Sequence, residues 1–233
     1  MQSIEESVRL FKEGWKTYQK IINSNYMFHR EISDTVRTFL ASHVGHQPLS
    51  LLDLGCGDAS QTLEAFKGAK ISCYHGCDVS DVALNHAREN LDHAGIVHLL
   101  EQRDMLECLS VDESTYDVVF ASFAMHHLDI EQKATFFSLA HARLKQNGIL
   151  ILVDLARAPE EDRPAYLKHY LGYAESHWSS LTAQQHAAIR QHAAAYDFPE
   201  TVAIYEELAK EAGFSEFRQL CKHTWHHVLV SKS

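Results

Sequence analysis

The chain has little of what nucleic-acid surfaces and cysteine-based metal centres require. Lysine and arginine number 21 against 31 aspartates and glutamates, and the net charge of −10 argues against an extended phosphate-binding surface. The five cysteines form no Cys-x-x-Cys pair, so we expect reduced, packed thiols and no metal site. These shortages leave a small molecule as the expected partner, with no nucleic acid.

Long hydrophobic runs are also lacking. No apolar stretch approaches the roughly 18 residues of a membrane span. The N-terminal stretch MQSIEESVRLFKEGW carries charge throughout, unlike an export signal. We therefore predict a cytoplasmic protein that does not associate with membranes.

Length and composition fit one α/β domain. With 233 residues, 45% of them hydrophobic, the chain can bury one good core, and a second domain is not expected. We divide it into an N-terminal helical cap (1–45), a ligand-binding core (50–155), a helical insert (158–200), and a last helix with closing strands (201–233). Nothing in the sequence indicates an oligomeric state.

Apolar residues follow first a helical and then a strand pattern. Three- and four-residue spacings predict two helices before the first strand, the second on Ile32, Val36, Phe39 and Leu40. Near-continuous apolar runs at 71–77, 96–102, 116–123 and 148–154 predict a parallel sheet covered by helices on both faces. Two late strands are expected at 217–222 and 225–231.

Capping residues mark two of the helices between these strands. Ser80 and Gly95 are the expected first and last cap of one helix. Asp129, followed three residues later by Gln132, is the expected start of another helix that stops at Asn147–Gly148.

A glycine loop flanked by carboxylates follows the first predicted strand. In LLDLGCGDAS, residues 51–60, Gly55 and Gly57 let backbone N–H groups approach a ligand at the carboxyl end of a strand. A dinucleotide loop would carry glycine or alanine where this chain has Ser60. Asp53 and Asp58 would also repel a pyrophosphate. They suit a ligand with adenine, ribose and sulfonium groups but no phosphate, and so predict S-adenosylmethionine.

Acidic residues recur at the ends of the predicted strands. Asp78 ends the second strand, 23 residues after Gly55, near the spacing of an acid that binds ribose hydroxyls. Asp104 follows the third strand, and Ser122 closes the fourth. A single aspartate at such a position more often caps a helix or a turn. Three of them, at 53, 78 and 104, along one edge of a sheet favour a shared ligand.

Together these motifs resemble the class I S-adenosylmethionine-dependent methyltransferases over about residues 25–155. The resemblance is carried by LLDLGCGDA, the strand-end Asp78, RDM at 103–105, YDVVFASFAMHHL at 116–128 and LKQNGILILVD at 144–154. Ala59 stands where many members have a third glycine, which is a small change. The resemblance implies a Rossmann-like α/β fold with seven strands in the order 3-2-1-4-5-7-6 and helices on both faces.

The resemblance also implies roles at the cofactor. Asp53 would orient the methionine end, Asp78 would hold the ribose, and Asp104 with Met105 would meet the adenine. Arg30 could pair with a carboxylate of the cofactor or the acceptor. The predicted cofactor residues are Asp53, Gly55, Cys56, Gly57, Asp78, Val79, Asp104, Met105, Ser122 and Arg30, and the product would be S-adenosylhomocysteine.

A pair of histidines lies directly beyond the fourth strand. Methyl transfer needs an acceptor held in line and, for some acceptors, a base that removes a proton. An imidazole titrates near working pH, so His126 or His127 is the predicted catalytic base, with His127 ahead. The competing interpretation is that the pair packs the cofactor pocket or caps the sheet.

Several functions remain open at this point. The favoured one is methyl transfer to an O, N or C atom of a small-molecule acceptor. The alternatives are a methyltransferase acting on tRNA or protein, a non-catalytic S-adenosylmethionine-binding module and, last, a NAD(P)-dependent oxidoreductase. A basic rim would favour tRNA, whereas a closed aromatic pocket would favour a small molecule.

Aromatic and histidine residues are dense in the two helical additions, 1–45 and 158–200. Such elements resemble the variable lids that the family places over the sheet edge. We expect them to lie over the carboxyl ends of the strands and to hold the acceptor; the alternative is that their aromatics are simply core. The predicted substrate residues are Tyr18, Tyr26, His29, Tyr170 and His177.

Overall fold

A single seven-stranded sheet forms the centre of the protein. The computed structural model describes residues 14, 16–45 and 47–233, and the part of the predicted cap at 1–13 lies outside them. The strand order is β3-β2-β1-β4-β5-β7-β6, as the family resemblance implies. The strands are β1 (Pro48–Leu54), β2 (Lys70–Asp78), β3 (His98–Gln102), β4 (Tyr116–Ser122), β5 (Leu144–Leu155), β6 (Glu216–His223) and β7 (His226–Lys232). Only β7 runs antiparallel to its neighbours.

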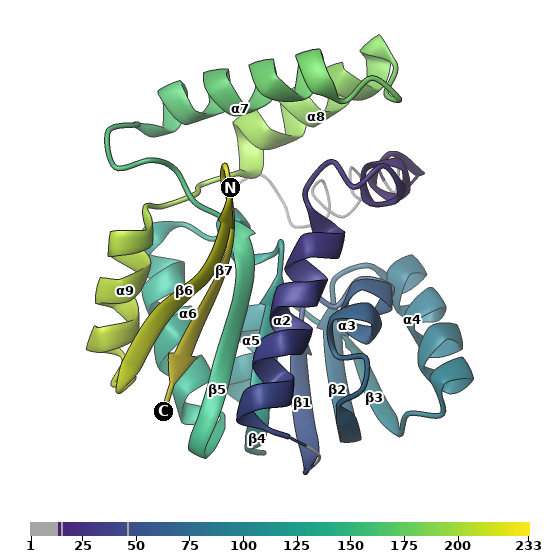
Figure 1. Ribbon diagram of the computed structural model, residues 1–233, viewed down its shortest axis with the longest axis vertical. Coiled ribbons are helices and arrows are strands. Elements are labelled where there is room, and N and C mark those ends of the chain that lie inside the picture. Colours follow the sequence, from purple (N-terminus) through teal and green to yellow (C-terminus); the bar gives the residue numbers. More distant parts are fainter. Residues whose placement is uncertain (1–13, 15, 46) are drawn as a thin grey trace.

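Helices cover both faces of the sheet, which confirms the predicted fold class (Figure 1). On one face lie α2 (His29–His43), α3 (Ser60–Ala65) and α4 (Asp81–Ala94), and on the other α5 (Met105–Val111), α6 (Ile130–Ala142) and α9 (Val202–Glu211). Successive strand residues point to opposite faces, so Leu51 joins the first apolar cluster and Leu52 the second. Helix packing therefore covers both faces of the sheet. The ends of the strands remain as places where a ligand can bind.

Local signals set two helix starts as expected. The Ser80 hydroxyl accepts from the Ala83 N–H, and Gly95 ends α4 with a φ of 69°. Asp129 and Gln132 form a reciprocal capping box at the start of α6. These bonds satisfy backbone donors that the first turn of a helix leaves unpaired.

The predicted end of α6 at Asn147–Gly148 is wrong. The helix ends at Ala142, and β5 begins at Leu144. Strand pairing takes over early because the Tyr116 N–H of β4 donates to the Arg143 oxygen at 2.8 Å. The Asn147–Gly148 signal instead marks a backbone irregularity inside β5, where Asn147 has a φ of 64°.

The helical insert lies above the carboxyl ends of the parallel strands. Helices α7 (Arg163–His177) and α8 (Ala183–Tyr196) stack there, and residues 16–27 lie beside them (Figure 1). The Tyr26 ring stacks on Trp178 with centroids 5.5 Å apart, and the Gln185 side chain donates to Thr17 at 3.1 Å. Helix α2, although part of the predicted cap, packs on the sheet face through Ile32 and Val36.

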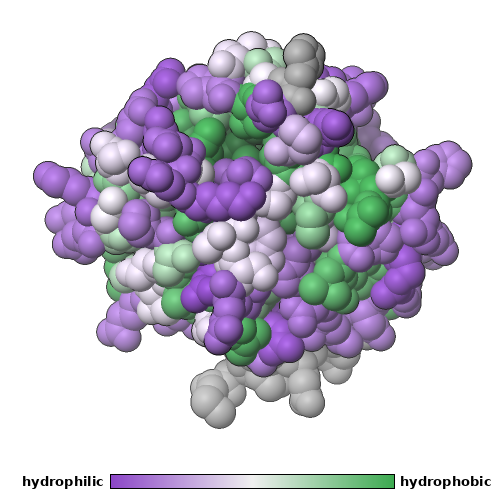
Figure 2. Space-filling view, turned by 90° about the horizontal axis from the view of Figure 1, so that it is seen from below, coloured by the Kyte–Doolittle hydropathy of each residue, from purple (hydrophilic) through white to green (hydrophobic). Residues whose placement is uncertain are grey.

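The opposite end of the molecule has a mixed surface. Seen from below, hydrophilic and hydrophobic residues alternate over it in small groups (Figure 2). Among the described residues, no helix is long and apolar enough to cross a membrane.

We predict that Asp129→Ala destabilises the protein. The substitution removes the acceptor for the Gln132 N–H and breaks the capping box, which should cost about 0.5–2 kcal/mol of the free energy of unfolding. Urea denaturation measures the change, and Asp129→Ser, which keeps a capping oxygen, is the control. A loss within about 0.5 kcal/mol for both variants would show that the box contributes little.

Candidate cofactor and acceptor site

The glycine loop turns sharply away from β1 and leaves its backbone open. The N–H groups of Gly55 and Cys56 both donate to the Cys77 oxygen, at 2.9 and 3.0 Å, so the loop is held against β2. Gly55 has a φ of 71°, and a Cβ there would lie 2.8 Å from the Ala124 Cβ. Around Gly57, with a φ of 55°, no heavy atom of the described residues lies within 4 Å of an added Cβ. Gly57 therefore leaves room for a ligand close to the backbone, although its own N–H already donates to Asp78.

Asp78 connects this loop to the next helix. One of its carboxylate oxygens accepts from the Gly57 N–H at 2.9 Å, and the other accepts from the Ser80 N–H at 2.8 Å. Burial raises its pKa, while the bonds from Ser80 and Gly57 act in the opposite direction. Val79 beside it is half-buried. The carboxylate thus stands next to the open backbone of Gly57, which fits the ribose role predicted for it.

Asp53 lies beneath the loop. It is 1% exposed, and one carboxylate oxygen accepts from the Thr62 hydroxyl at 2.6 Å and the Tyr74 hydroxyl at 2.5 Å. Burial raises its pKa to about 6, against the opposing effect of those two hydrogen bonds. Core residues therefore hold the Asp53 side chain in place. Asp53 would act on the charged end of a cofactor through the glycine loop above it.

The remaining predicted cofactor residues lie in four places. Asp104 caps α5 by accepting from the Leu106 N–H at 2.9 Å, and it is half-buried together with Met105. Cys56 is buried within the loop, and Ser122 is half-buried at the end of β4. Arg30 is exposed, and its guanidinium donates to the Asn23 oxygen at 3.3 Å.

Aromatic and histidine side chains gather where β4 ends. The Phe123 ring lies 5.2 Å from His29 and 5.9 Å from His226, and the Tyr18 ring lies 6.4 Å from His29. The Tyr170 hydroxyl is 3.4 Å from the His226 Nε2. Burial raises the pKa of Tyr18, and the nearby charges of Asp58 and Asp78 raise it further. The cluster therefore lies close to the glycine loop. We call these five residues, Tyr18, His29, Phe123, Tyr170 and His226, the acceptor cluster.

His29 is the most unusual member of this cluster. It is 4% exposed, and neither ring nitrogen has a hydrogen-bond partner among the described residues. Burial lowers its pKa to about 4, so the imidazole is neutral at pH 7. Leaving a buried polar atom unpaired costs about 1–3 kcal/mol, so the His29 nitrogens call for a partner such as a water molecule, an ion or a ligand.

Sequence analysis missed His226. It is the first residue of β7 and pairs with Leu155, the last of β5. In the implied order 5-7-6, an antiparallel strand 7 has its first residue at the carboxyl edge of the parallel strands. The strand order together with HH at 226–227 could therefore have pointed to it.

Two predicted substrate residues lie outside the acceptor cluster. The Tyr26 hydroxyl accepts from the Ser180 N–H at 2.8 Å, so this side chain joins residues 16–27 to the insert. His177 is exposed at the end of α7, where its ring stacks on Tyr173 with centroids 4.1 Å apart. The structure brings together Tyr18, His29 and Tyr170 of the predicted set.

The predicted bases, His126 and His127, have different surroundings. The buried His126 has its Nδ1 at 2.5 Å from an Asp154 oxygen; burial lowers its pKa, but the charges of Asp154 and Asp197 outweigh this and raise it. The His127 side chain is 37% exposed, and its Nδ1 lies 3.2 Å from the Tyr196 oxygen. Their role as general base stays a prediction.

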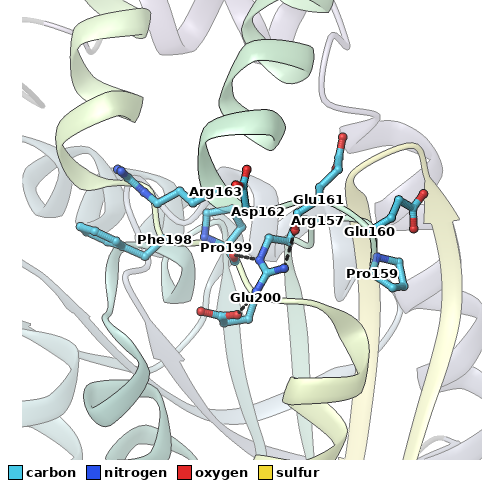
Figure 3. Close-up of a pocket in the computed structure, with 9 residues that line it drawn as sticks. All are labelled: Arg157, Pro159, Glu160, Glu161, Asp162, Arg163, Phe198, Pro199 and Glu200. Atoms are coloured by element: carbon cyan, nitrogen blue, oxygen red, sulfur yellow. Dashed lines mark hydrogen bonds and ion pairs between the residues drawn. The ribbon is translucent and has the colours of Figure 1, made fainter.

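A surface cavity of about 390 Å³ lies at the base of the insert (Figure 3). Arg157 crosses it, donating to the Pro199 oxygen at 3.2 Å and to the Glu200 carboxylate at 2.7 Å. The two connections of the insert are thereby clamped to each other. No predicted site residue lines this cavity, whose lining is Arg157, Pro159, Glu160, Glu161, Asp162, Arg163, Phe198, Pro199 and Glu200.

Comparison with known proteins agrees with this geometry. Residues 51–148 match the model of the family described as Methyltransferase domain. This match lies within the predicted ligand-binding core and, with the strand order, agrees with the methyltransferase family that the sequence resembles. The predicted methyltransferase domain is thereby confirmed over residues 51–148.

The chain is similar to a phosphoethanolamine N-methyltransferase of Plasmodium falciparum, with 24% identity over 76% of this chain and 64% of that protein. It is 35% identical to an uncharacterized methyltransferase of Synechocystis sp. over 46% of this chain and 47% of the other. The chain therefore spans less than two thirds of these curated relatives. Its fold is similar to magnesium protoporphyrin IX methyltransferase from Synechocystis PCC 6803 with bound SAH, at a TM-score of 0.60 and 15% identity, covering 88% of this chain and 82% of the other.

We predict that Asp53 lowers stability as pH rises from about 4 to 7. Its folded pKa of about 6 exceeds its ordinary value of 3.8, so the native state binds more protons in this window. The stabilisation is complete below pH 4 and is lost as pH rises through 6. Relative to Asp53→Asn, the wild type should lose roughly 3 kcal/mol between pH 4 and pH 7.

Urea denaturation at several pH values measures this difference. Asp117→Asn is the control, because hydrogen bonds from Lys145 and Ser50 overcome burial and lower the pKa of Asp117, so its difference should change in the opposite direction. A flat difference for Asp53→Asn would contradict the raised pKa.

Proposed function

We propose that this protein transfers a methyl group from S-adenosylmethionine to an O, N or C atom of a small-molecule acceptor. The observation that carries the proposal is the buried His29, whose two ring nitrogens lack partners beside Phe123 at the end of β4. Tyr18 joins this histidine to the glycine loop through its proximity to Asp58 and Asp78. Cofactor and acceptor sites would thus be adjacent.

The residues around the loop fit the cofactor. Gly57 has room for a ligand against its backbone, and Asp78 offers carboxylate oxygens for ribose hydroxyls. Met105 at the start of α5 and Ser122 at the end of β4 are half-buried, as adenine and methionine contacts would require. When bound, S-adenosylmethionine supplies an electrophilic methyl group. The chain's own residues then need to orient an acceptor, exclude water and, where necessary, accept a proton.

The acceptor cluster suits a small polar molecule. A neutral imidazole donates one hydrogen bond and accepts one, so His29 can orient a hydroxyl or amine group. Phe123 and the phenol ring of Tyr170 supply flat apolar walls with few polar groups, as small-molecule sites do. The names of two similar proteins, acting on phosphoethanolamine and on magnesium protoporphyrin IX, support a small acceptor.

Residues 16–27 and the insert would form the lid over this site. They share one apolar cluster that includes Ile21, Tyr170 and Trp178. Gln19 also donates to Asp58 of the glycine loop at 3.3 Å, so the segment touches both the insert and the loop. Such a lid would exclude water from the reacting atoms and determine which acceptor binds.

We predict that S-adenosylmethionine and S-adenosylhomocysteine, but not NAD(H) or NADP(H), bind the purified protein. Asp78→Ala removes the ribose acceptor and unties Gly57, so it should weaken binding roughly ten- to a hundredfold. Isothermal calorimetry measures both effects, and the exposed Asp92→Ala on α4 is the control. Tighter binding of a nicotinamide nucleotide would refute the proposed function.

We predict that His29→Phe separates stability from activity. It replaces a buried imidazole with a ring of similar size and removes two unpaired polar atoms, so the free energy of unfolding should rise by about 1 kcal/mol or more. Methyl transfer should fall tenfold or more, with unchanged S-adenosylmethionine affinity.

The assay measures S-adenosylhomocysteine release with phosphoethanolamine and a panel of phenols, amines and carboxylic acids. His43→Phe, at the other end of α2, is the matched control. Unchanged turnover in His29→Phe would show that the acceptor binds elsewhere.

A further inference from the structure

Three histidines and one aspartate meet between the sheet and the insert. His126 and His127 come from the short helix after β4 (Met125–His127), His192 lies on α8, and Asp197 follows α8 directly. An Asp197 oxygen lies 3.8 Å from the His126 Nε2, 3.5 Å from the His127 Nδ1 and 3.9 Å from the His192 Nε2. The potential ligand atoms of His126, His127 and Asp197 all lie within 4.8 Å of one another.

The aspartate oxygen at the centre of this group has no hydrogen-bond partner among the described residues. Asp197 is 5% exposed, and it is this Oδ1 that is buried and unpaired. Its three imidazole neighbours lie 3.5–3.9 Å away, beyond hydrogen-bond geometry. Burial raises the pKa of Asp197, but the charge of His126 and the contact with His127 outweigh this and lower it. A buried carboxylate in this position requires a proton donor or a cation.

His126 is held in the orientation that a metal ligand needs. Its Nδ1 lies 2.5 Å from one Asp154 oxygen, and its backbone N–H donates to the other at 3.0 Å. The Leu155 N–H also donates to Asp154, so the 1% exposed carboxylate is fixed at the end of β5. If His126 carries a proton on Nδ1 alone, its Nε2, 3.8 Å from Asp197, has a lone pair with which to bind an ion. Metal-ligating histidines characteristically have such an outer carboxylate.

The donor set selects the class of metal. Imidazole nitrogens with one carboxylate oxygen suit Zn²⁺ and similar transition metals, whereas Ca²⁺ and Mg²⁺ prefer oxygen ligands alone. Bonds of about 2.0–2.1 Å place tetrahedral donor atoms about 3.3 Å apart. The 3.5–3.9 Å distances from the Asp197 oxygen therefore need to shorten by a few tenths of an ångström. The ligand atoms of His126 and His127 lie within 4.8 Å of each other and also have to move closer, and the His192 Nε2, outside that group, has to move further.

Two neighbouring groups act against a cation here. The His127 Nδ1 would have to give up its contact with the Tyr196 oxygen, 3.2 Å away. The buried ammonium of Lys133 is nearby, and the backbone oxygens of Leu128 and Phe198 accept its hydrogen bonds. The His127 side chain is 37% exposed, so its ring has room to turn and an ion has a route of entry.

We propose that His126, His127, His192 and Asp197 bind a divalent transition metal of the zinc class, with Asp154 as the outer carboxylate. The ion would join the short helix after β4 to the end of α8. The Phe198 N–H already donates to the His126 oxygen at 2.7 Å, so a hydrogen bond holds these two segments together without the ion. The metal would fix the insert over the carboxyl edge, and it makes His126 and His127 ligands and not bases.

The test is metal content and affinity of the full chain after any affinity tag is removed. We expect about one zinc ion per chain, retained through gel filtration and measured by mass spectrometry of the metal. Asp197→Asn and His192→Gln should each weaken Zn²⁺ tenfold or more in competition with a chromophoric chelator. Asp154→Asn should weaken it ten- to a hundredfold. His86→Gln and Asp92→Asn on α4 are matched controls and should bind as the wild type does.

Thermal unfolding with added Zn²⁺ gives a second measurement. Zn²⁺ should raise the unfolding midpoint of the wild type and of both controls but not that of Asp197→Asn. Circular dichroism and S-adenosylmethionine binding show that each variant is folded. Equal Zn²⁺ affinity in all variants, or binding no tighter than to exposed histidines, would overturn the proposal. Neither measurement involves methyl transfer. A negative zinc result would therefore leave the proposed function standing, and a failure of methyl transfer would leave the proposed metal site standing.

Discussion

The carboxylate of Asp78 connects the two loops on which the proposed cofactor site depends. It accepts one N–H from Gly57, after β1, and one from Ser80, after β2. These strands are neighbours and parallel, so a single side chain can hold both of their ends. The shape of the glycine loop and the start of α4 are therefore determined together, next to the open backbone of Gly57.

Buried carboxylates concentrate along this edge of the sheet. Asp53, Asp78, Asp154 and Asp197 each have an exposure of 7% or less. Removing a carboxylate from water is costly, and hydrogen bonds only partly compensate. This cost raises the pKa of Asp53. At Asp197, nearby histidine charges overcome the effect of burial and lower the pKa. Stability comes instead from the two apolar clusters on the sheet faces, which support a polar edge.

The position of the insert follows from the same contrast between apolar sheet faces and a polar sheet edge. Helices α2 to α4 and α5, α6 and α9 already cover both faces of the sheet. The aromatic side chains of α7 are therefore buried at the carboxyl edge of the sheet. There Tyr166, Tyr170 and Trp178 pack with residues 16–27. Arg157, Phe198 and Lys133 then secure its two connections to the core. The result is a polar edge enclosed by an apolar cover.

The sequence by itself determined the strands, the starts of helices α4 and α6 and the acidic residues at the strand ends, because these depend on short-range patterns. Apolar periodicity, caps such as Ser80 and Asp129, and the Asp-x-Gly-x-Gly loop act within a few residues of themselves. Only the tertiary structure decided that His29 and His226, 197 residues apart in sequence, meet beside Phe123. It also decided that Asp197 meets His126, because partners of a buried group are chosen by packing between distant segments and leave no local pattern.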